Sequence, residues 1–212
     1  YFDKICRSDV FVFLDNVQFK KNEWQNRNKI KTDQKWQWLT VPVIHRFSQK
    51  IKEVEINNTD RWGKKHLNAL ITNYSKAPFF NDYVDFFEQA YTRSWQLLVD
   101  INVHLIQYLN QALGILNKTL VLSSSYETRE GRTERLVDLC KQLKGDVYLS
   151  GKDGAKYLEL EEFKKENIQV VFQDYKHPIY PQLFGHFEPC MSVVDLLFNC
   201  GPESLSILSK GE

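Results

Sequence analysis

Cysteine and metal-ligand patterns are scarce in this 212-residue chain. Its four cysteines, Cys6, Cys140, Cys190 and Cys200, form no C-x-x-C pair, and its five histidines form no H-E-x-x-H motif. No standard zinc spacing is present, so we expect no bound metal. Because three of the cysteines lie inside apolar stretches, we expect free thiols and a reducing, cytoplasmic location.

Charge bias and long apolar runs are also missing. The formal net charge is +1, so the chain as a whole is not attracted to nucleic acid or to acidic membranes. No apolar run approaches the roughly 20 residues of a membrane helix, so we expect no membrane span. Aromatic residues are plentiful, with 10 Tyr, 14 Phe and 5 Trp. They favour either a thick aromatic core or a site that stacks on rings.

The segment from Asp15 to Val43 has the highest density of potential binding groups. An apolar run leads directly into side-chain amides, basic residues and three tryptophans. Trp supplies a flat apolar face and one N–H donor, while Asn, Gln and Arg supply directional hydrogen bonds, a combination typical of small-molecule sites. The alternative is a twisted hairpin with core tryptophans and turn-capping amides. The candidate substrate-binding residues here are Asp15, Gln18, Trp24, Asn26, Arg27 and Asn28.

Four segments of the chain resemble the WbqC-like protein family. They are DNVQFKKNEWQNRNKI followed by WLTVPV, then NYSKAPFF, GDVYLSGKDGAKYL and HPIYPQLFGHFEPCMSVVDLLFNCG. The resemblance extends over nearly the whole chain. Family members usually begin with a short strand and a His-Gln-Pro segment just before the position of Tyr1, and this chain lacks both. Because the family's genes are typically found among surface-polysaccharide genes, the resemblance implies a role in such biosynthesis.

Four short apolar runs predict buried parallel strands, and each stops at small or polar residues. Helical patterns separate the last three runs, which predicts two consecutive βαβ units. Ligands of open parallel sheets bind outside the carboxyl ends of the strands. We therefore expect Asp15, Ser123, Ser150 and Asp174 near one edge of a mostly parallel α/β sheet, of Rossmann-like or, by fold analogy, nucleotidylyltransferase-like type. The runs are 10–14, 119–122, 147–149 and 168–172.

A long excursion separates the first two strands. It begins with an expected antiparallel hairpin, 28–32 and 35–43, and a third antiparallel strand at 52–56. Helical patterns follow at 60–74 and 81–113. We expect a single domain, 1–212, with this hairpin and helical insertion at about 28–115. Further helices are expected at 132–144, at 154–167 and between Ser192, as N-cap, and Gly201.

Two strand-end segments are candidate anion sites. Arg132 and Arg135 open a helix whose dipole should disfavour basic residues, so a bound anion is one compensation. Pairing with neighbouring glutamates is the alternative. Ser150 and Lys152 lie in SGKDG, where glycines allow close backbone approach and Lys152 can reach a phosphate or carboxylate. A tight strand-to-helix turn is the alternative there.

The segment from His177 to Pro189 holds the candidate catalytic groups. His177 and His186 are candidate general bases because imidazole titrates near neutrality, and Tyr180 and Gln182 are candidate substrate ligands. A surface loop with incidental histidines is the alternative. Asp195 lies on an otherwise apolar helix, and a polar side chain in that setting usually has a specific partner.

The sequence is compatible with three functions. The first is a transferase or ligase that acts on an activated sugar or related metabolite, with an anionic or nucleotide-linked small-molecule substrate and no cofactor indicated. The second is a noncatalytic module that binds a sugar or nucleotide. The third, single-stranded nucleic-acid binding through basic and aromatic residues, is disfavoured by the net charge.

Overall fold

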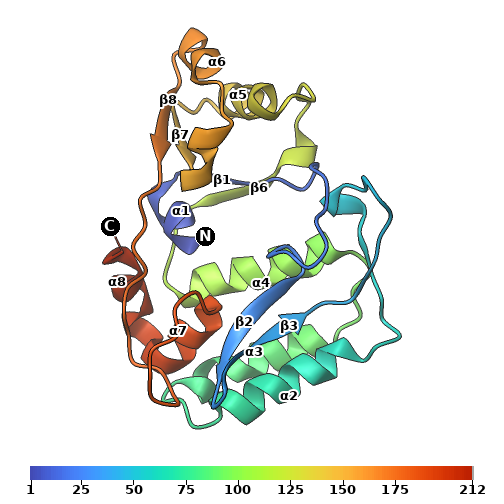
Figure 1. Cartoon of the computed structure of the whole chain (residues 1–212), viewed down its shortest axis with the longest axis vertical. Helices are drawn as coiled ribbons and strands as arrows, with labels where there is room; N and C mark the ends of the chain where they lie inside the picture. Colours follow the sequence, from blue (N-terminus) through green and yellow to red (C-terminus); the bar gives the residue numbers. More distant parts are fainter. Residues whose placement is uncertain (212) are drawn as a thin grey trace. The chain divides into compact units, whose positions relative to one another are not determined.

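The computed structural model describes residues 1–211, which divide into two compact units (Figure 1). Unit 1 comprises Tyr1–Asp15 and Asn117–Lys176, and unit 2 comprises Asn16–Leu116 and His177–Gly211. The excursion expected at about 28–115 lies within unit 2, and the single-domain organisation stays a prediction. Among residues 1–211 no helix is long and apolar enough to cross a membrane.

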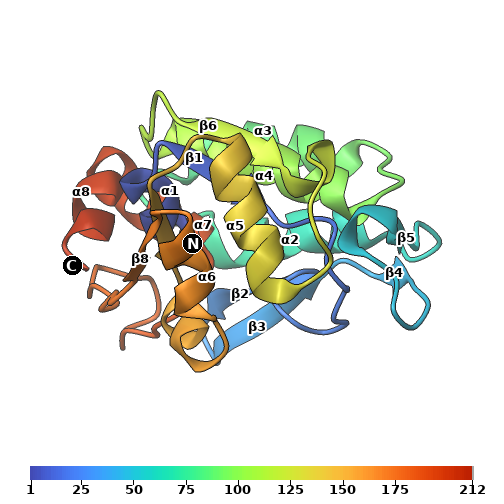
Figure 2. The ribbon, with the colours of Figure 1, turned by 90° about the horizontal axis from the view of Figure 1, so that it is seen from above.

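Unit 1 contains the four short parallel strands. Strand β1 pairs in parallel with β6, and β7 pairs in parallel with β8, so all four expected strands are confirmed. The helices α5 and α6 lie at the same end of this unit (Figures 1 and 2). They share a core with the β7–β8 ladder, formed by Leu136, Val137, Leu158, Phe163 and Ile168. The elements are α1 Phe2–Arg7, β1 Val10–Phe13, β6 Thr119–Leu122, α5 Arg132–Gln142, β7 Val147–Ser150, α6 Leu160–Lys165 and β8 Gln169–Phe172.

The strand pairing differs from the expected single sheet. The described residues form two separate two-stranded parallel ladders, and a Rossmann-like sheet is not shown. Of the two expected βαβ units, only β7–α6–β8 has the predicted partners, because β6 pairs with β1 instead of β7. Apolar patterning identifies a strand but not its neighbour, so the sequence did not determine this pairing. Helix α1, which the sequence pattern did not predict, is tied to the end of β8 by a Gln173–Asp3 hydrogen bond.

Two helices are shorter than the residue ranges predicted for them from the sequence. The helix predicted at 154–167 is wrong in its first half, where a 3₁₀ turn, Lys152–Lys156, precedes α6. Gly154 packs against Ser150 so closely that a Cβ atom would lie 2.0 Å from the Ser150 hydroxyl oxygen. The helix predicted at 81–113 is divided into α3 Phe80–Thr92 and α4 Leu98–Ala112. Between them the Gln96 carbonyl accepts a hydrogen bond from the Ile56 N–H at 2.8 Å, and this tertiary contact overrides helix propensity.

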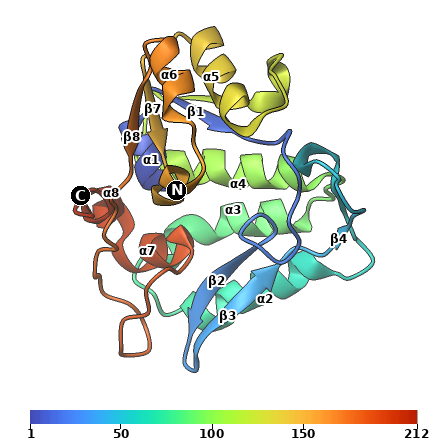
Figure 3. The ribbon, with the colours of Figure 1, turned by 45° about the horizontal axis from the view of Figure 1, so that its top comes forward.

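Unit 2 is built around an antiparallel hairpin and three long helices. The predicted hairpin is confirmed, and β2 lies against both α2 and α7 (Figure 3). The expected third strand is present only as β5, which pairs with β4 and not with the hairpin. Besides α3 and α4, the elements are β2 Arg27–Thr32, β3 Lys35–Thr40, β4 Val43–Ile44, β5 Glu55–Ile56, α2 Trp62–Tyr74, α7 Val193–Cys200 and α8 Ser204–Ser209, the last not predicted.

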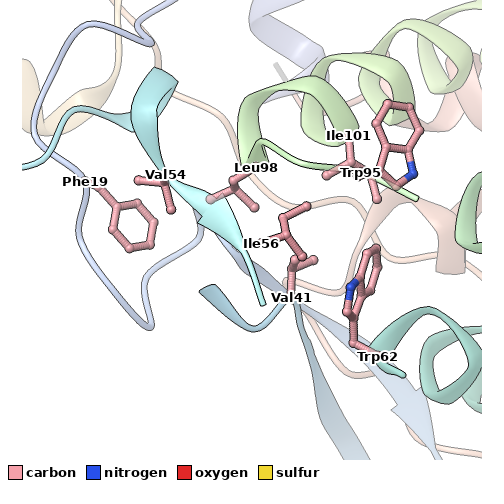
Figure 4. Close-up of a cluster of buried hydrophobic side chains, with 8 residues drawn as sticks. All are labelled: Phe19, Val41, Val54, Ile56, Trp62, Trp95, Leu98 and Ile101. Atoms are coloured by element: carbon pink, nitrogen blue, oxygen red, sulfur yellow. The ribbon is translucent and has the colours of Figure 1, made fainter. Parts of the chain in front are cut away.

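The core of unit 2 contains two of the five tryptophans. Trp62 and Trp95 are 4% and 5% exposed, and both lie in one apolar cluster with residues of β5 and α4 (Figure 4). Their indole N–H groups donate to the Asn58 side chain at 3.2 Å and to the Ala90 carbonyl at 2.8 Å. Burial of these large rings with satisfied donors stabilises the unit. The cluster consists of Phe19, Val41, Val54, Ile56, Trp62, Trp95, Leu98 and Ile101.

Candidate functional site

One face of the β2–β3 hairpin carries alternating cations and tryptophans. Lys29 pairs with Trp38, and Lys31 pairs with Trp36, while Arg27 precedes them on β2. Side chains at paired positions and at every second residue point to the same side of a ladder. These five side chains therefore share one side, which we call the hairpin face.

The open end of the hairpin face is lined by three indole rings, Trp24, Trp36 and Trp38, here called the tryptophan platform. Trp24 is 55% exposed and Trp36 is 38% exposed, and Trp38 meets both rings edge to face, with centroids 5.2 and 5.6 Å apart. The Lys29 ammonium lies 4.0 Å from the centroid of Trp36 and 5.1 Å from that of Trp38. The Arg27 guanidinium lies 4.0 Å over Trp38. Contacts of this kind hold each cation in place by about 0.5–1 kcal/mol at exposed sites.

The cations of this open end lack acidic partners. Within residues 1–211, neither Arg27 nor Lys29 forms an ion pair, and the Arg27 Nε group is buried without a hydrogen-bond acceptor. A buried donor without an acceptor costs about 1–3 kcal/mol. An anionic ligand near Arg27 and Lys29 would compensate their charge.

The other end of the hairpin face is covered by the 177–190 segment. Lys31 is 1% exposed, and its ammonium donates to the Gln182 side-chain oxygen at 3.2 Å and to the backbone carbonyl of His186. Its backbone N–H donates to the Tyr74 hydroxyl at 2.8 Å. The ammonium group of a buried lysine needs such acceptors, so Lys31 joins the hairpin, helix α2 and the 177–190 segment.

A buried carboxylate, Asp195 on α7, organises this covered end. It accepts hydrogen bonds from the Tyr74 hydroxyl at 2.8 Å, the Tyr180 hydroxyl at 2.9 Å and the Gln182 amide at 2.7 Å. Burial raises the pKa of Asp195, and these hydrogen bonds and the charge of Lys31 oppose that rise. Burial also raises the pKa values of Tyr74 and Tyr180, so both hydroxyls remain protonated donors at neutral pH. We call these five residues the Asp195 network.

Local capping explains why Asp195 lies there. Ser192 caps α7, and its hydroxyl accepts from the Val194 N–H at 3.4 Å, as predicted. The Ser192 N–H donates to the Lys29 carbonyl at 2.7 Å, which attaches the start of α7 to the hairpin. Asp195, in the first turn of α7, therefore lies close to the strand that carries Lys31.

The two candidate histidines differ in burial and in their contacts. The ring of His177 is half-buried and packs against Tyr180 and Phe187, with centroids 6.2 and 5.6 Å apart. The side chain of His186 is exposed, and this residue contributes its carbonyl to Lys31. The structure therefore places the imidazole of His177 beside the Asp195 network.

Three other candidates of unit 2 lie away from the hairpin face. Asn26 is 2% exposed, and its side chain accepts from the Asn22 N–H and donates to the Val41 carbonyl, both at 3.0 Å, so its amide holds a turn. Asn28 is exposed at an alternate position of β2 and therefore points to the opposite side. Gln18 is exposed and pairs with Lys50 through a single bridge.

In unit 1 two of the expected strand-end residues, Asp15 and Ser123, are in contact, while Ser150 bonds to Gln173, the residue before Asp174. Asp15 is 3% exposed and accepts from the Ser123 hydroxyl and the Ser124 N–H, both at 2.9 Å, at the ends of β1 and β6. Ser150 is 2% exposed, and its carbonyl accepts from the Gln173 N–H at 2.9 Å at the end of the other ladder.

The candidate cations of unit 1 are mostly solvent-facing. Arg132 and Lys152 are exposed. Arg135 donates through Nη2 to the Glu130 carbonyl at 3.1 Å, while its Nε group is buried without an acceptor. The neighbouring Arg129 pairs with Asp138 at 2.7 Å and not with a glutamate.

The arrangement of the metal-ligating side chains and cysteines is as follows. In the described part of the chain, no group of three or more His, Cys, Asp or Glu side chains is placed to hold a metal ion. The four cysteines are free, as expected, although only Cys200 is fully buried, Cys6 and Cys140 are half-buried, and Cys190 is exposed.

Lys29, Lys31 and Tyr74 were not placed in the candidate small-molecule site from the sequence. The available signal was the period-two alternation of Arg27, Lys29 and Lys31 opposite two tryptophans, which predicts one shared strand face. Tyr74 carried no local signal, because its partners Lys31 and Asp195 are far away in the sequence.

Comparison with known proteins identifies relatives. The model of the WbqC-like protein family matches residues 1–207. A curated relative from Mycobacterium tuberculosis (strain ATCC 25618 / H37Rv), named uncharacterized protein Rv1507c, is 41% identical over 208 residues, which cover 96% of this chain and 89% of that protein. No solved structure matches the chain significantly.

Proposed function

Because the chain belongs to the WbqC-like protein family, we propose that it is a transferase or ligase acting on an activated sugar or a related anionic metabolite. One observation carries the proposal. A single hairpin face brings two cations without acidic partners, held over tryptophan rings, next to a buried network of a carboxylate, two tyrosines, a glutamine and a lysine. Binding sites for small molecules combine apolar walls with a few fixed polar groups in this way.

Each part of the face has a role in this proposal. Trp24 supplies a ring surface for the substrate, and Arg27 binds its anionic part. The Asp195 network orients Tyr180 and Gln182 toward the substrate and holds the 177–190 segment in place. His177 acts as general base, with the side chain of His186 as the alternative, because a neutral imidazole nitrogen can accept a proton from the substrate.

In this proposal, unit 1 contributes a second anion site. The fold proposed for unit 1 is Rossmann-like or nucleotidylyltransferase-like. Two parallel ladders with helices at one end support that assignment. Polar groups at the strand ends and at the start of α5 would bind the anionic or nucleotide-linked part of a substrate. These residues are Asp15, Ser150, Lys152, Arg132 and Arg135.

The anion site of unit 1 has its own test. Sulfate should raise the melting temperature of the wild-type protein, because a ligand that binds the folded state stabilises it. Arg132→Ala should lose much of that rise, whereas Lys164→Ala, which removes an exposed lysine of α6, should retain it. Equal protection of all three proteins would leave Arg132 as an ordinary surface residue.

The function itself is tested by ligand and product analysis. Native mass spectrometry of the protein against nucleotides, nucleotide sugars and acyl donors identifies the bound class. Chromatography of reaction mixtures then shows whether a group is transferred. We expect His177→Ala to bind the ligand normally and to lose about 10²–10⁴-fold in turnover, the usual contribution of a general base. The same loss in His186→Ala alone would assign the base to His186.

A noncatalytic sugar- or nucleotide-binding module is the second candidate. It is favoured by the completeness of the Asp195 network, in which both carboxylate oxygens and both polar atoms of the Gln182 side chain have protein partners. A structural network needs no substrate. Saturable binding of a nucleotide sugar without any detectable transfer would support this candidate over the enzyme.

Free cysteines bear on where the protein acts. The four thiols form no disulfide, which supports the proposal of a reducing, cytoplasmic compartment. In this proposal, the protein acts on its activated sugar in that compartment.

A further inference from the structure

We infer that the tryptophan platform, together with Arg27 and Lys29, is a subsite for a sugar ring that carries an anionic group, either a carboxylate or a phosphate. The inference deepens the proposed function, because it names the substrate class of the hairpin face. Binding at this subsite is measurable without turnover. The subsite and the proposed enzyme activity can therefore be tested, and contradicted, independently.

Charge is the first argument for an anionic ligand. Several other cations of the protein have acidic partners, for example Lys65 with Asp60 and Lys165 with Glu162, and the buried Lys31 has two oxygen acceptors. Arg27 and Lys29 have aromatic partners instead, and the structure of residues 1–211 gives neither an acidic one. Two fixed, uncompensated positive charges on one strand face favour a negatively charged ligand.

The buried Nε group of Arg27 strengthens this argument. It lacks any acceptor in the described residues, and the guanidinium carbon lies 4.0 Å from the centroid of Trp38. The accessible N–H groups of a guanidinium bind a carboxylate or phosphate oxygen with directional hydrogen bonds. With no acceptor at Nε and no acidic partner, this guanidinium keeps a positive charge that an anionic ligand compensates.

Ring geometry favours a sugar over a sandwiched base. The planes of Trp24 and Trp38 are inclined by 62°, and those of Trp36 and Trp38 by 77°. Trp38 therefore forms no parallel pair with either neighbour into which a flat base can be inserted. Each exposed ring instead offers a single apolar surface, which suits the C–H face of a pyranose ring.

The indole donors supply the polar part of the match. Within residues 1–211, the N–H groups of Trp24, Trp36 and Trp38 donate to no protein acceptor, whereas those of Trp62 and Trp95 do. Sugar hydroxyl and ring oxygens accept such hydrogen bonds. A sugar ring therefore satisfies the apolar faces and the free donors together.

Strand geometry orients the bound ring. Lys29 and Lys31 are two residues apart on β2, a spacing of about 7 Å along the strand. The ammonium of Lys31 contacts Gln182. A sugar ring held beside Lys29 therefore lies two residues along the strand from Lys31, a member of the Asp195 network. In the proposed function, this network faces the reacting end of the substrate.

Indole resonances give a direct test with the complete protein. ¹⁵N-labelled protein shows five indole N–H signals, assigned by single Trp→Phe variants. Titration with D-glucuronate and with D-glucose 6-phosphate separates the carboxylate from the phosphate, and neutral D-glucose is the control. We expect saturable shifts of the Trp24, Trp36 and Trp38 signals with at least one anionic sugar, at about tenfold lower concentration than with glucose. The signals of Trp62 and Trp95 should not move.

Charge-removing variants complete the test. Arg27→Gln and Lys29→Gln should weaken binding of the anionic sugar about tenfold and leave glucose binding unchanged. Lys64→Gln, which removes an exposed lysine of α2, should behave as wild type. Equal shifts by glucose and by both anionic sugars, equal shifts of all five indoles, or shifts caused only by a single-stranded oligothymidylate added as a further probe would overturn the inference. Binding without turnover would overturn the proposed enzyme and not this subsite.

Discussion

The five tryptophans divide into two groups that use the same side chain in opposite ways. Trp62 and Trp95 lie in the apolar cluster of unit 2, at most 5% exposed, with both indole donors satisfied by the protein. Trp24, Trp36 and Trp38 form the tryptophan platform next to cations, and Trp24 and Trp36 have 55% and 38% of their surface exposed. Burial with satisfied donors stabilises a fold, whereas exposed rings with open donors are suited to binding.

The largest expected difference between the groups is in stability. Trp95→Ala should lower the free energy of unfolding by about 3–5 kcal/mol, because it leaves a large cavity. Trp36→Ala should lower it by only about 1–2 kcal/mol, because the ring is 38% exposed and its removal leaves no enclosed cavity. Urea unfolding followed by circular dichroism measures both. Similar losses for the two variants would show that the hairpin rings belong to the core.

Asp195 tests whether the covered end of the hairpin face is built for stability. Asp195→Ala should lower the free energy of unfolding by about 3 kcal/mol, because three buried donors lose their acceptor. Asp100→Ala, on the exposed side of α4, is the matched control and should have almost no effect. Urea unfolding of both variants decides the point, and a neutral Asp195→Ala would contradict the described network.

His66 makes the core of unit 2 sensitive to acid. Burial lowers its pKa to about 4, and its Nε2 lies 3.0 Å from the Thr40 carbonyl. The unfolded chain, with an ordinary pKa near 6.5, binds more protons than the folded chain between these values, so stability falls as the pH drops from 6.5 toward 4. The loss between pH 8 and pH 5 should be about 2 kcal/mol.

The matched variant for this prediction is His66→Gln. It keeps an N–H donor for the Thr40 carbonyl and does not titrate in this range. Unfolding midpoints in urea at pH 8, 6.5 and 5 should show a smaller pH dependence for the variant. An unchanged pH dependence would assign the acid sensitivity to other groups.

The smallest expected effect on stability is that of Arg27. Arg27→Gln removes a cation–π contact but also a buried unpaired donor, so the free energy of unfolding should change by less than about 0.5 kcal/mol. Thermal unfolding without ligand checks this. A large loss would mean that Arg27 supports the hairpin itself.

Much of the local structure was predictable from the sequence, and much of the pairing was not. Two strand-like runs joined by a short turn, 28–32 and 35–43, predicted the hairpin, and Ser192 predicted the start of α7, because these signals depend on neighbours in the chain. The partner of β6 is β1, more than a hundred residues earlier, and the break before α4 depends on hydrogen bonds to β5. Such tertiary contacts leave no periodic signal.

The candidate site shows the same division. Trp24, Arg27, Tyr180 and Gln182 were identified from residue types, and the structure places them on or beside the hairpin face. Their assembly was not predictable, because Lys31 meets Gln182 across 151 positions of the chain. Asn26 had the same composition signal as its neighbours, yet its buried amide holds the turn to Val41.

The most direct test of the central claim, that the hairpin face binds and the tryptophan core stabilises, is ligand-induced thermal stabilisation. D-glucuronate or D-glucose 6-phosphate at ten times its dissociation constant should stabilise wild type and Lys64→Gln by about 1.4 kcal/mol. Lys29→Gln should unfold at the wild-type temperature without ligand and gain far less from the same concentration. Equal gains for Lys29→Gln and wild type with both sugars would contradict the claim.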